Sequence, residues 1–345
     1  MRCVGLGTVI RGVMVLTLWL VSSLVLASPR ALFFNPGSAD DSFWGDVDQL
    51  MQVAAISLEI DLTILHSERD HFKMIAQLNE QLNLTSPLPE YVILVNEKRS
   101  SMPMLQALRP YPIYVQLLLS DITPLERAHL LQDEHWQQYL LPPVVPNYQQ
   151  IGADTARALV QQVSEGVSQG VMIAGDKSTP ASQFRSLGAE QVFTNEPKVE
   201  LTQVVYGHWN EAIAYEQTRV LLNRYPKLKL IWTASDQMAS GAIRALTESQ
   251  RRAGQDVFVA TFNTSLNALH LRRTNQVSVL GGGHFLAGGL GLLQIQAHRQ
   301  TGHYRQADKI QLFRILQPAS RFFEMLEARQ WQQMFQSEIV DVINQ

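Results

Sequence analysis

The chain has 345 residues, of which 46% are hydrophobic and 17% are charged, a balance typical of a globular protein large enough for two domains. A formal net charge of −3 without any basic stripe argues against a nucleic-acid-binding protein. No heptad pattern, low-complexity tract or solenoid repeat is present, which excludes coiled-coil and repeat architectures.

The N-terminus has the pattern of a secretory signal peptide. Arg2 and Arg11 precede the apolar run "VMVLTLWLVSSLVLA", which ends in small residues at Ala27, the predicted cleavage site. The alternative, a retained membrane anchor, would need a longer run and a following cluster of charges. The only cysteine, Cys3, precedes the cleavage site, so the mature chain is expected to carry neither a disulfide nor a lipid anchor. We therefore expect a periplasmic protein.

Strand and helix patterns alternate through the rest of the chain. Apolar, β-branched runs predict strands at 31–35, 60–66, 91–96, 111–119, 170–176, 199–207, 228–234, 256–263 and 276–282. Helical spacing of apolar residues predicts helices at 43–59, 71–83, 102–109, 153–168, 181–193, 209–226, 237–246, 265–273, 285–300 and beyond 320.

This alternation predicts an α/β fold with parallel sheets and crossover helices. The strands are continuous apolar runs, as expected for strands covered on both faces. Ligands bind such sheets beyond the carboxyl ends of the strands. The strand ends alone place the following residues at a common rim: Asn35, His66, Asn96, Leu118 to Asp121, Asp176, Gly207 to Trp209, Ser235, Asp236, Asn263 and Gly281 to His284.

The rim residues suit a small polyhydroxyl ligand. Phe43, Trp44 and Trp209 offer flat rings for the C–H face of a sugar. Hydrogen bonds to hydroxyl groups would come from four polar residues: Asp41, Arg185, Asp236 and Asn263.

Each of these residues also has a purely structural interpretation. Asp236 could only cap the helix that follows it. Phe43 and Trp44 could be core residues of their helix, Trp209 could pack on its neighbours, and Arg185 could be solvated or salt-bridged.

Other constellations in the sequence are weaker. His66, Glu68 and His71 do not have the spacing of a metal-binding helix, and "GGGHFLAGG" lacks the spacing and the lysine of a phosphate-binding loop. We found no nucleophile elbow. The expectation is a protein without metal, cofactor or catalytic residues.

The segment "NRYPKLKLIWTASDQMASGAIRALTESQRRAGQDVFVATFN" (223–263) resembles type I periplasmic binding proteins of the ribose-binding and repressor-core superfamily. It has the family's order: a helix closed by proline, a strand, a polar–Asp pair, MA-x-GA-x-x-AL, and a strand ending here in Phe262-Asn263 instead of Phe-Asp. The start "FFNPGSADDSFW" (33–44) matches the family's first strand and aromatic pair, and the resemblance covers nearly all of the mature chain.

The resemblance implies two doubly wound parallel-sheet lobes joined by a three-segment hinge. Crossings near Asn147, Gly282 and Arg305 would divide the chain into an N-terminal lobe (28–147 plus 283–305), a C-terminal lobe (148–282 plus 306–320) and a helical tail (321–345).

The resemblance also implies ligand-binding roles for residues from both lobes. Phe43 and Trp44 fall where the family stacks its sugar. Arg185, three residues before Gly188, falls on a ligand-binding arginine, and Trp209 falls near an aromatic that closes the other face. Ser235 and Asp236 fall on a polar pair that lines the cleft.

The chain departs from the ribose type at two places. Leu117 to Leu119 replace an Asp–Arg pair, and Gly282 stands where a polar residue is usual, so the expected pocket is more apolar. "PGSADDSFW" and "SQFR" are also similar to stretches of autoinducer-2 receptors, although the second arginine of those receptors would fall at Gly282.

The implied function is capture of a small sugar-like ligand in the cleft and its delivery to an inner-membrane ABC permease. Two alternatives remain open from the sequence. One is a sensing subunit, like an autoinducer-2 receptor, that signals to a membrane histidine kinase or cyclase. The other is a secreted hydrolase, which would need a nucleophile and a base at the rim.

Overall fold

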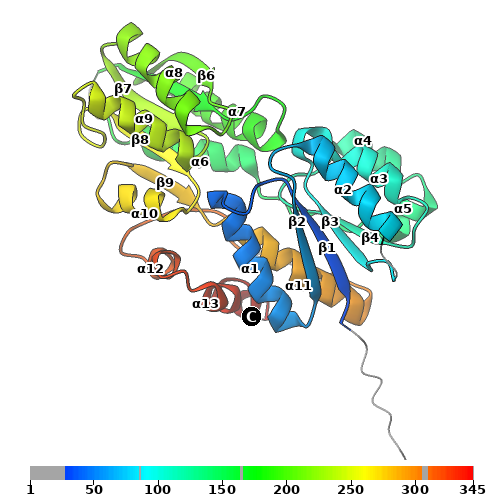
Figure 1. The fold of residues 1–345 in the computed structure, drawn as a ribbon. Helices are drawn as coiled ribbons and strands as arrows, with labels where there is room; N and C mark the ends of the chain where they lie inside the picture. Colours follow the sequence, from blue (N-terminus) through cyan, green and yellow to red (C-terminus); the bar gives the residue numbers. More distant parts are fainter. Residues whose placement is uncertain (1–27, 85–86, 164–165, 305–309, 345) are drawn as a thin grey trace, which may run out of the picture.

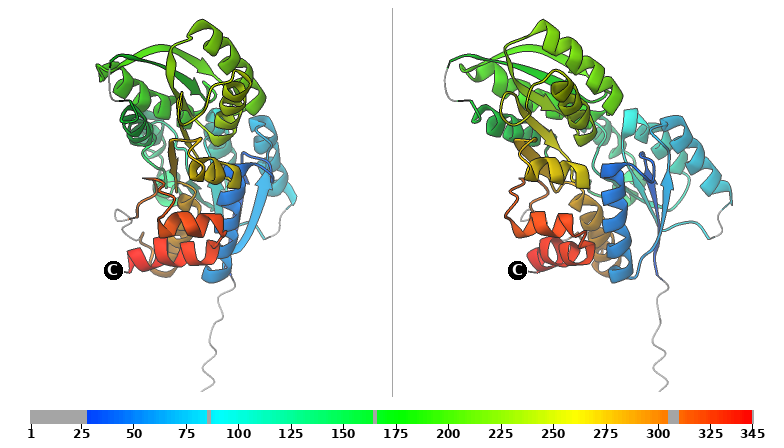
Figure 2. Two further views of the ribbon diagram at one scale, coloured as in Figure 1. Left: turned by 90° about the vertical axis from the view of Figure 1, so that its left-hand side faces the viewer. Right: turned by 60° about the vertical axis from the view of Figure 1, so that its left-hand side comes forward.

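A computed structural model describes residues 28–84, 87–163, 166–304 and 310–344. The predicted signal peptide, its cleavage site and Cys3 lie outside these ranges. No helix within them is long and apolar enough to cross a bilayer. Two sheets, each flanked by helices, form the two lobes seen in Figures 1 and 2.

The first sheet has the order β2-β1-β3-β4, with all pairs parallel. Its strands are β1 (Arg30–Asn35), β2 (Asp61–His66), β3 (Tyr91–Leu94) and β4 (Tyr114–Leu117). Bridges from Val115 to Leu140 and from Leu118 to Val144 add a further segment beside β4. The helices of this first lobe are α1 (Ser42–Leu58), α2 (His71–Leu84), η1 (Glu97–Arg99), α3 (Ser101–Leu108), α4 (Pro124–Leu130), α5 (Glu134–Tyr139) and α11 (Leu286–Thr301).

The second sheet has the order β10-β9-β8-β7-β5-β6. Its strands are β5 (Ser168–Ala174), β6 (Val199–Tyr206), β7 (Leu228–Thr233), β8 (Phe258–Phe262), β9 (Val279–Gly282) and β10 (Arg314–Ile315). Only β10 is antiparallel to its neighbour. The helices of this second lobe are α6 (Tyr148–Val160), α7 (Pro180–Asn195), α8 (Glu211–Arg224), α9 (Asp236–Glu248) and α10 (Leu266–Arg273).

The chain passes repeatedly between the sheets. It enters the second lobe before α6, and after β9 it returns to pack α11 against α1. It then rejoins the second sheet at β10. The remaining helices are α12 (Arg321–Glu327), α13 (Trp331–Phe335), η2 (Gln336–Val340) and α14 (Asp341–Ile343). Since α12 contacts α10 and α13 contacts α1, this tail touches both lobes.

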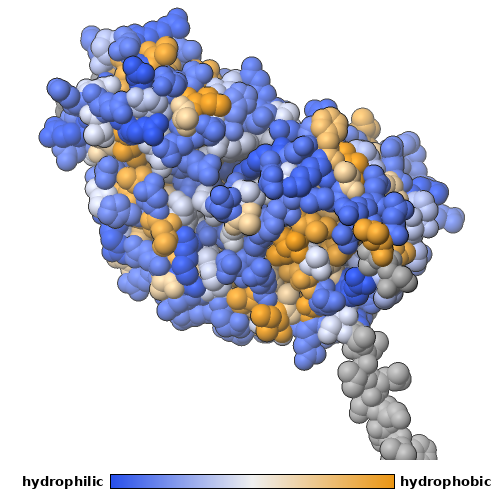
Figure 3. Space-filling view, viewed as in Figure 1, coloured by the Kyte–Doolittle hydropathy of each residue, from blue (hydrophilic) through white to orange (hydrophobic). Residues whose placement is uncertain are grey.

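The burial of β1 shows why its sequence is apolar throughout. Leu32 and Phe34 belong to one hydrophobic cluster, whereas Ala31 and Phe33 belong to another on the opposite face. Successive strand residues point to opposite faces, so a strand covered by helices on both sides needs apolar residues at every position. The face of the molecule shown in Figure 3 is mostly hydrophilic, with apolar residues gathered in patches.

The predicted fold class, α/β with two parallel-sheet lobes, is confirmed. Three details differ from the prediction. The helices α4 and α5 were not expected. The short antiparallel strand β10 was not expected, and the helix expected over 153–168 runs from Tyr148 to Val160. Asn147 starts this helix early because its side chain accepts a hydrogen bond from the backbone N–H of Gln150 at 3.0 Å.

Candidate functional site

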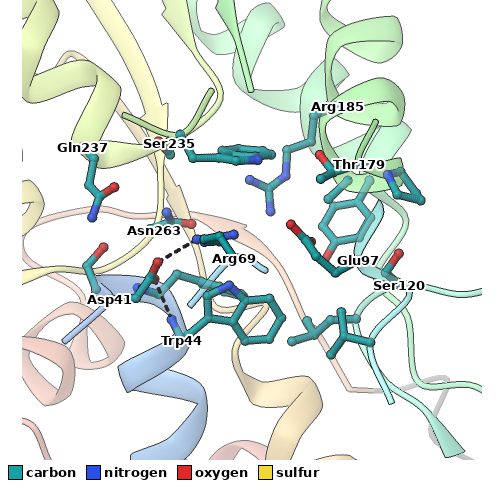
Figure 4. A pocket seen from close by; sticks show the side chains of 18 of the residues that line it. Asp41, Trp44, Arg69, Glu97, Ser120, Thr179, Arg185, Ser235, Gln237 and Asn263 are labelled. Atoms are coloured by element: carbon teal, nitrogen blue, oxygen red, sulfur yellow. Dashed lines mark hydrogen bonds and ion pairs between the residues drawn. The ribbon is translucent and has the colours of Figure 1, made fainter. Parts of the chain in front are cut away.

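A cavity of about 610 Å³, partly continuous with solvent, lies between the lobes, and side chains from both lobes face it (Figure 4). All eight residues proposed from the sequence line it: Asp41, Phe43, Trp44, Arg185, Trp209, Ser235, Asp236 and Asn263. The structure therefore brings the residues together, while their role in binding a ligand stays a prediction.

The first lobe contributes the start of α1. Asp41 is the N-cap residue of this helix, and its Oδ1 accepts hydrogen bonds from the backbone N–H groups of Phe43 and Trp44 at 3.0 and 3.1 Å. Its Oδ2 lies 2.6 Å from Nη2 of Arg69, which follows β2. Asp41 therefore holds both aromatic residues and an arginine at the cavity wall.

The Trp44 side chain packs tightly on the loop after β1. It is only 5% exposed, and a Cβ placed on Gly37 would lie 2.5 Å from its Cγ. The rings of Phe43 and Trp44 meet edge to face at 5.1 Å, and Phe43 stacks on the imidazole of His284 at 4.5 Å. Phe43 and Trp44 thus have packing partners and also face the cavity, so both interpretations from the sequence hold at once.

Arg185 on α7 is buried and held on several sides. Nη1 donates to the carbonyl oxygen of Ala234 at 3.0 Å, and Nη2 lies 2.8 Å from Nε2 of His284. The rings of Tyr148 and Phe262 lie 4.8 and 4.9 Å from its guanidinium carbon. Because Nη2 can only donate, Nε2 of His284 must accept, which requires a neutral imidazole. Burial, and next the charge of Arg185, lower the pKa of His284 well below 6.5.

Asp236 is the first residue of α9, and Ser235 occupies the N-cap position without a side-chain capping bond. The carboxylate of Asp236 accepts from Nδ2 of Asn263 at 2.9 Å and from Oγ of Ser42 at 3.3 Å. Burial raises its pKa, against hydrogen bonds from Ser265, Asn263 and the backbone of Gln237 that lower it. Asp236 is therefore more than a helix cap, because it also connects the lobes at the cavity.

A second polar connection between the lobes lies at Asp46 on α1. Its Oδ2 accepts from the hydroxyl of Thr264, which follows β8 in the second lobe, at 2.5 Å. Its Oδ1 accepts from Nη1 of Arg329 in the tail at 2.8 Å. Any separation of the lobes at this point must break the Asp46–Thr264 bond.

Several cavity residues were not proposed from the sequence: Ser42, Arg69, Glu97, Ser120, Tyr148, Thr179 and Gln237. Ser120 lies within the predicted rim segment Leu118 to Asp121, although it was not selected as a ligand-binding residue. Glu97 directly follows the rim residue Asn96. Arg69 lies three residues after β2, where Glu68 and Arg69 both have positive φ angles. His284 belonged to the predicted rim but was not selected as a ligand-binding residue. It is a polar residue in the segment after β9, where the chain returns to the first lobe.

Five buried polar atoms at the cavity have no hydrogen-bond partner within the described part of the chain. They are Oε1 of Glu97, Nε of Arg185, Nε1 of Trp209, Oγ of Ser235 and Oδ1 of Asn263. Unpaired buried polar groups are costly, and such groups are rare in native proteins. Five such atoms around one cavity suit a polar ligand that could pair with them.

The sequence and the structure were compared with known proteins. Residues 31–280 match the family model described as "Periplasmic binding protein domain". A periplasmic sugar-binding protein from Pseudomonas fluorescens has 30% sequence identity and a TM-score of 0.76, over 88% of this chain and 89% of that one. The chain therefore belongs to the periplasmic binding protein family, as the sequence predicted.

More distant structures share the fold. A galactofuranose-binding protein superposes with a TM-score of 0.72 at 12% identity, over 90% of this chain and 99% of the other. The binding component of an arabinose transporter from Shewanella sp. ANA-3 superposes with a TM-score of 0.69 at 15% identity, over 91% of this chain and 98% of the other.

The lactose operon repressor of Escherichia coli (strain K12) is 31% identical over 101 residues, which is 29% of this chain and 28% of the repressor. This match is too short to compare the two whole proteins.

Proposed function

We propose that this protein is a periplasmic solute-binding protein that captures a small sugar-like or polyol ligand between its lobes and presents it to an inner-membrane ABC permease. The observation that carries the proposal is the interlobe cavity. It combines two indole rings with five buried polar atoms that have no hydrogen-bond partner among the described residues. Indole faces suit the C–H face of a sugar, and the unpartnered atoms suit its hydroxyl groups.

The relatives support this assignment. The Pseudomonas fluorescens protein is described as a periplasmic sugar-binding protein, and other structures with this fold bind galactofuranose or arabinofuranose. The predicted signal peptide is consistent with the periplasm as the site of action. We propose no catalytic residue and no cofactor.

The mechanism follows from where the contacts lie. Phe43, Trp44 and Glu97 belong to the first lobe, whereas Arg185 and Trp209 belong to the second. A ligand can touch both sets only when the lobes are close together, so it binds the closed form more tightly and shifts the population toward it. A membrane permease then distinguishes the closed form from the open form. No bond in the ligand is made or broken.

A thermal-shift screen tests the proposal. The protein without its predicted signal peptide is heated with sugars, polyols and furanosyl compounds one at a time, because a ligand of the native state raises the melting temperature. We expect a saturable increase with at least one sugar. Solution scattering should show a smaller radius of gyration with that sugar. If no sugar or polyol stabilises the protein and a glycoside is hydrolysed instead, the proposal is wrong.

A further inference from the structure

The charged groups of the cavity define its ligand more closely. This inference rests on the proposed function, because it concerns which sugars the same cavity accepts. Two arginines at a binding site usually suggest an anionic ligand, since guanidinium groups match carboxylates and phosphates. The ion pair of Arg69 and the carboxyl group of Glu97 in this structure point the other way.

Arg69 is already neutralised by the protein. Its Nη2 lies 2.6 Å from Oδ2 of Asp41, and the Asp41 side chain is itself only 10% exposed. An anionic ligand would have to compete with this close carboxylate for the arginine. Arg69 is therefore better placed to hold Asp41, and with it the start of α1, than to bind a second anion.

Arg185 is anchored by the protein at both terminal nitrogens. Both terminal nitrogens have protein partners, Ala234 and His284, and aromatic rings lie on the guanidinium. Among its nitrogens Nε alone lacks a partner in the described structure. Each terminal nitrogen also keeps a second hydrogen, so Arg185 can donate to several oxygens of a ligand, and it does not by itself decide between hydroxyl groups and a carboxylate.

Glu97 faces the same cavity from the first lobe and has a free acceptor. It is 6% exposed, and its Oε1 has no hydrogen-bond partner in the part of the chain that the structure describes. Figure 4 shows its side chain pointing into the cavity, on the side of Arg185. Burial raises the pKa of this carboxyl group, although the charges of Arg69 and Lys98 oppose the shift. A ligand hydroxyl could donate to Oε1, whereas a ligand carboxylate would be repelled.

We infer that Glu97 is a specificity-determining residue that makes the cavity select neutral polyhydroxyl ligands over their acidic counterparts. Three carboxyl groups, from Asp41, Glu97 and Asp236, line the cavity with two guanidinium groups, and one of these guanidinium groups, that of Arg69, is already paired with Asp41. Repulsion between a ligand carboxylate and the carboxylate of Glu97 in this buried site should weaken binding by about tenfold or more.

Matched pairs of sugars test the inference. Isothermal titration compares galactose with galacturonate, glucose with glucuronate, and arabinose with arabinonate, on the wild-type protein and on Glu97→Gln. We expect the neutral member of each binding pair to bind at least about tenfold more tightly to the wild type. Glu97→Gln keeps the shape of the side chain but removes its charge. This variant should reduce the ratio of the acid's dissociation constant to that of the neutral sugar by about fivefold or more.

Glu216→Gln is the control, because Glu216 is an exposed residue of α8 that pairs only with Arg219 in the described structure, outside the cavity. It removes the same charge and should leave the ratio unchanged. An acid that binds the wild type as tightly as its neutral partner overturns the inference while leaving sugar binding intact. An unchanged ratio in a folded Glu97→Gln protein also overturns it, and if Glu97→Gln does not fold, the wild-type ratio decides. If no sugar binds at all, the proposed function is wrong, and the inference about Glu97, which rests on it, is wrong as well.

Discussion

The indole of Trp209 lies against the backbone of Gly175: a Cβ placed on Gly175 would be 2.3 Å from Cζ2 of the ring. Gly175 follows β5, the first strand of the second lobe, as Gly37 follows β1, the first strand of the first lobe. Trp44 lies on Gly37 in the same way, at 2.5 Å. Each lobe therefore presents one indole to the cavity across a glycine.

Gly175→Ala should move Trp209 and weaken ligand binding by about tenfold. His208 and Trp209 both have positive φ angles, so the loop has few alternative conformations that would accommodate a methyl group. The measurement is a titration with a sugar that the thermal-shift screen identifies. Gly45→Ala is the control, because its Cβ would meet its nearest neighbour at an ordinary 3.7 Å. Equal affinities of the wild type and Gly175→Ala would show that the position of the indole is unimportant.

Trp44→Ala and Trp209→Ala should each weaken ligand binding by at least about tenfold, because each removes one aromatic face from the cavity. Circular dichroism should show that both variants remain folded, with the larger loss of stability for Trp44, the more buried of the two. Unchanged affinity in both folded variants would mean that the ligand does not stack on these rings.

The sequence was sufficient to predict the rim of the cavity but not its charge arrangement. Counting residues from strand ends found Trp209 and Asp236, because the carboxyl ends of parallel strands meet at one edge of each sheet. Arg69 reaches the cavity through a left-handed turn at Glu68 and Arg69. Nothing in residue type alone predicts that turn, since both residues usually avoid positive φ.

The partners of the buried groups depended on contacts between distant parts of the chain. Arg185 and His284 are 99 residues apart, and Asp46 and Arg329 are 283 residues apart. The periodic pattern of the tail predicted helices, but only the folded structure shows that Arg329 contacts α1. Such contacts have no local signal, because they arise from the packing of elements that the sequence separates.

The stability of the protein should decrease as the pH falls below about 6.5, partly because of His284. Its pKa is lowered in the folded state, first by burial and then by Arg185, whereas in the unfolded chain it stays near 6.5. The unfolded state therefore binds more protons in this range, which favours unfolding. His284→Gln removes the titrating group and should flatten the dependence between pH 5 and pH 7. Denaturant titrations at several pH values measure this, and an unaltered slope in the variant would contradict it.

Asp46 should change the stability with pH in the direction opposite to His284. Burial, which the neighbouring Asp236 reinforces, raises its pKa from 3.8 to about 7, against Arg329 and Thr264, which lower it. Between these two values the folded protein binds a proton that the unfolded chain does not, so this group lowers stability as the pH rises from about 4 to 7. Asp46→Asn keeps the shape without the titration and should remove that loss. Asp46 also joins α1 to Thr264 and to the tail. Its ionisation strengthens these hydrogen bonds, but it also adds the free-energy cost of a buried charge. If Asp46→Asn leaves the dependence of stability on pH between about 4 and 7 unchanged, the ion pair with Arg329 outweighs the burial, and Asp46 is ionised throughout this range.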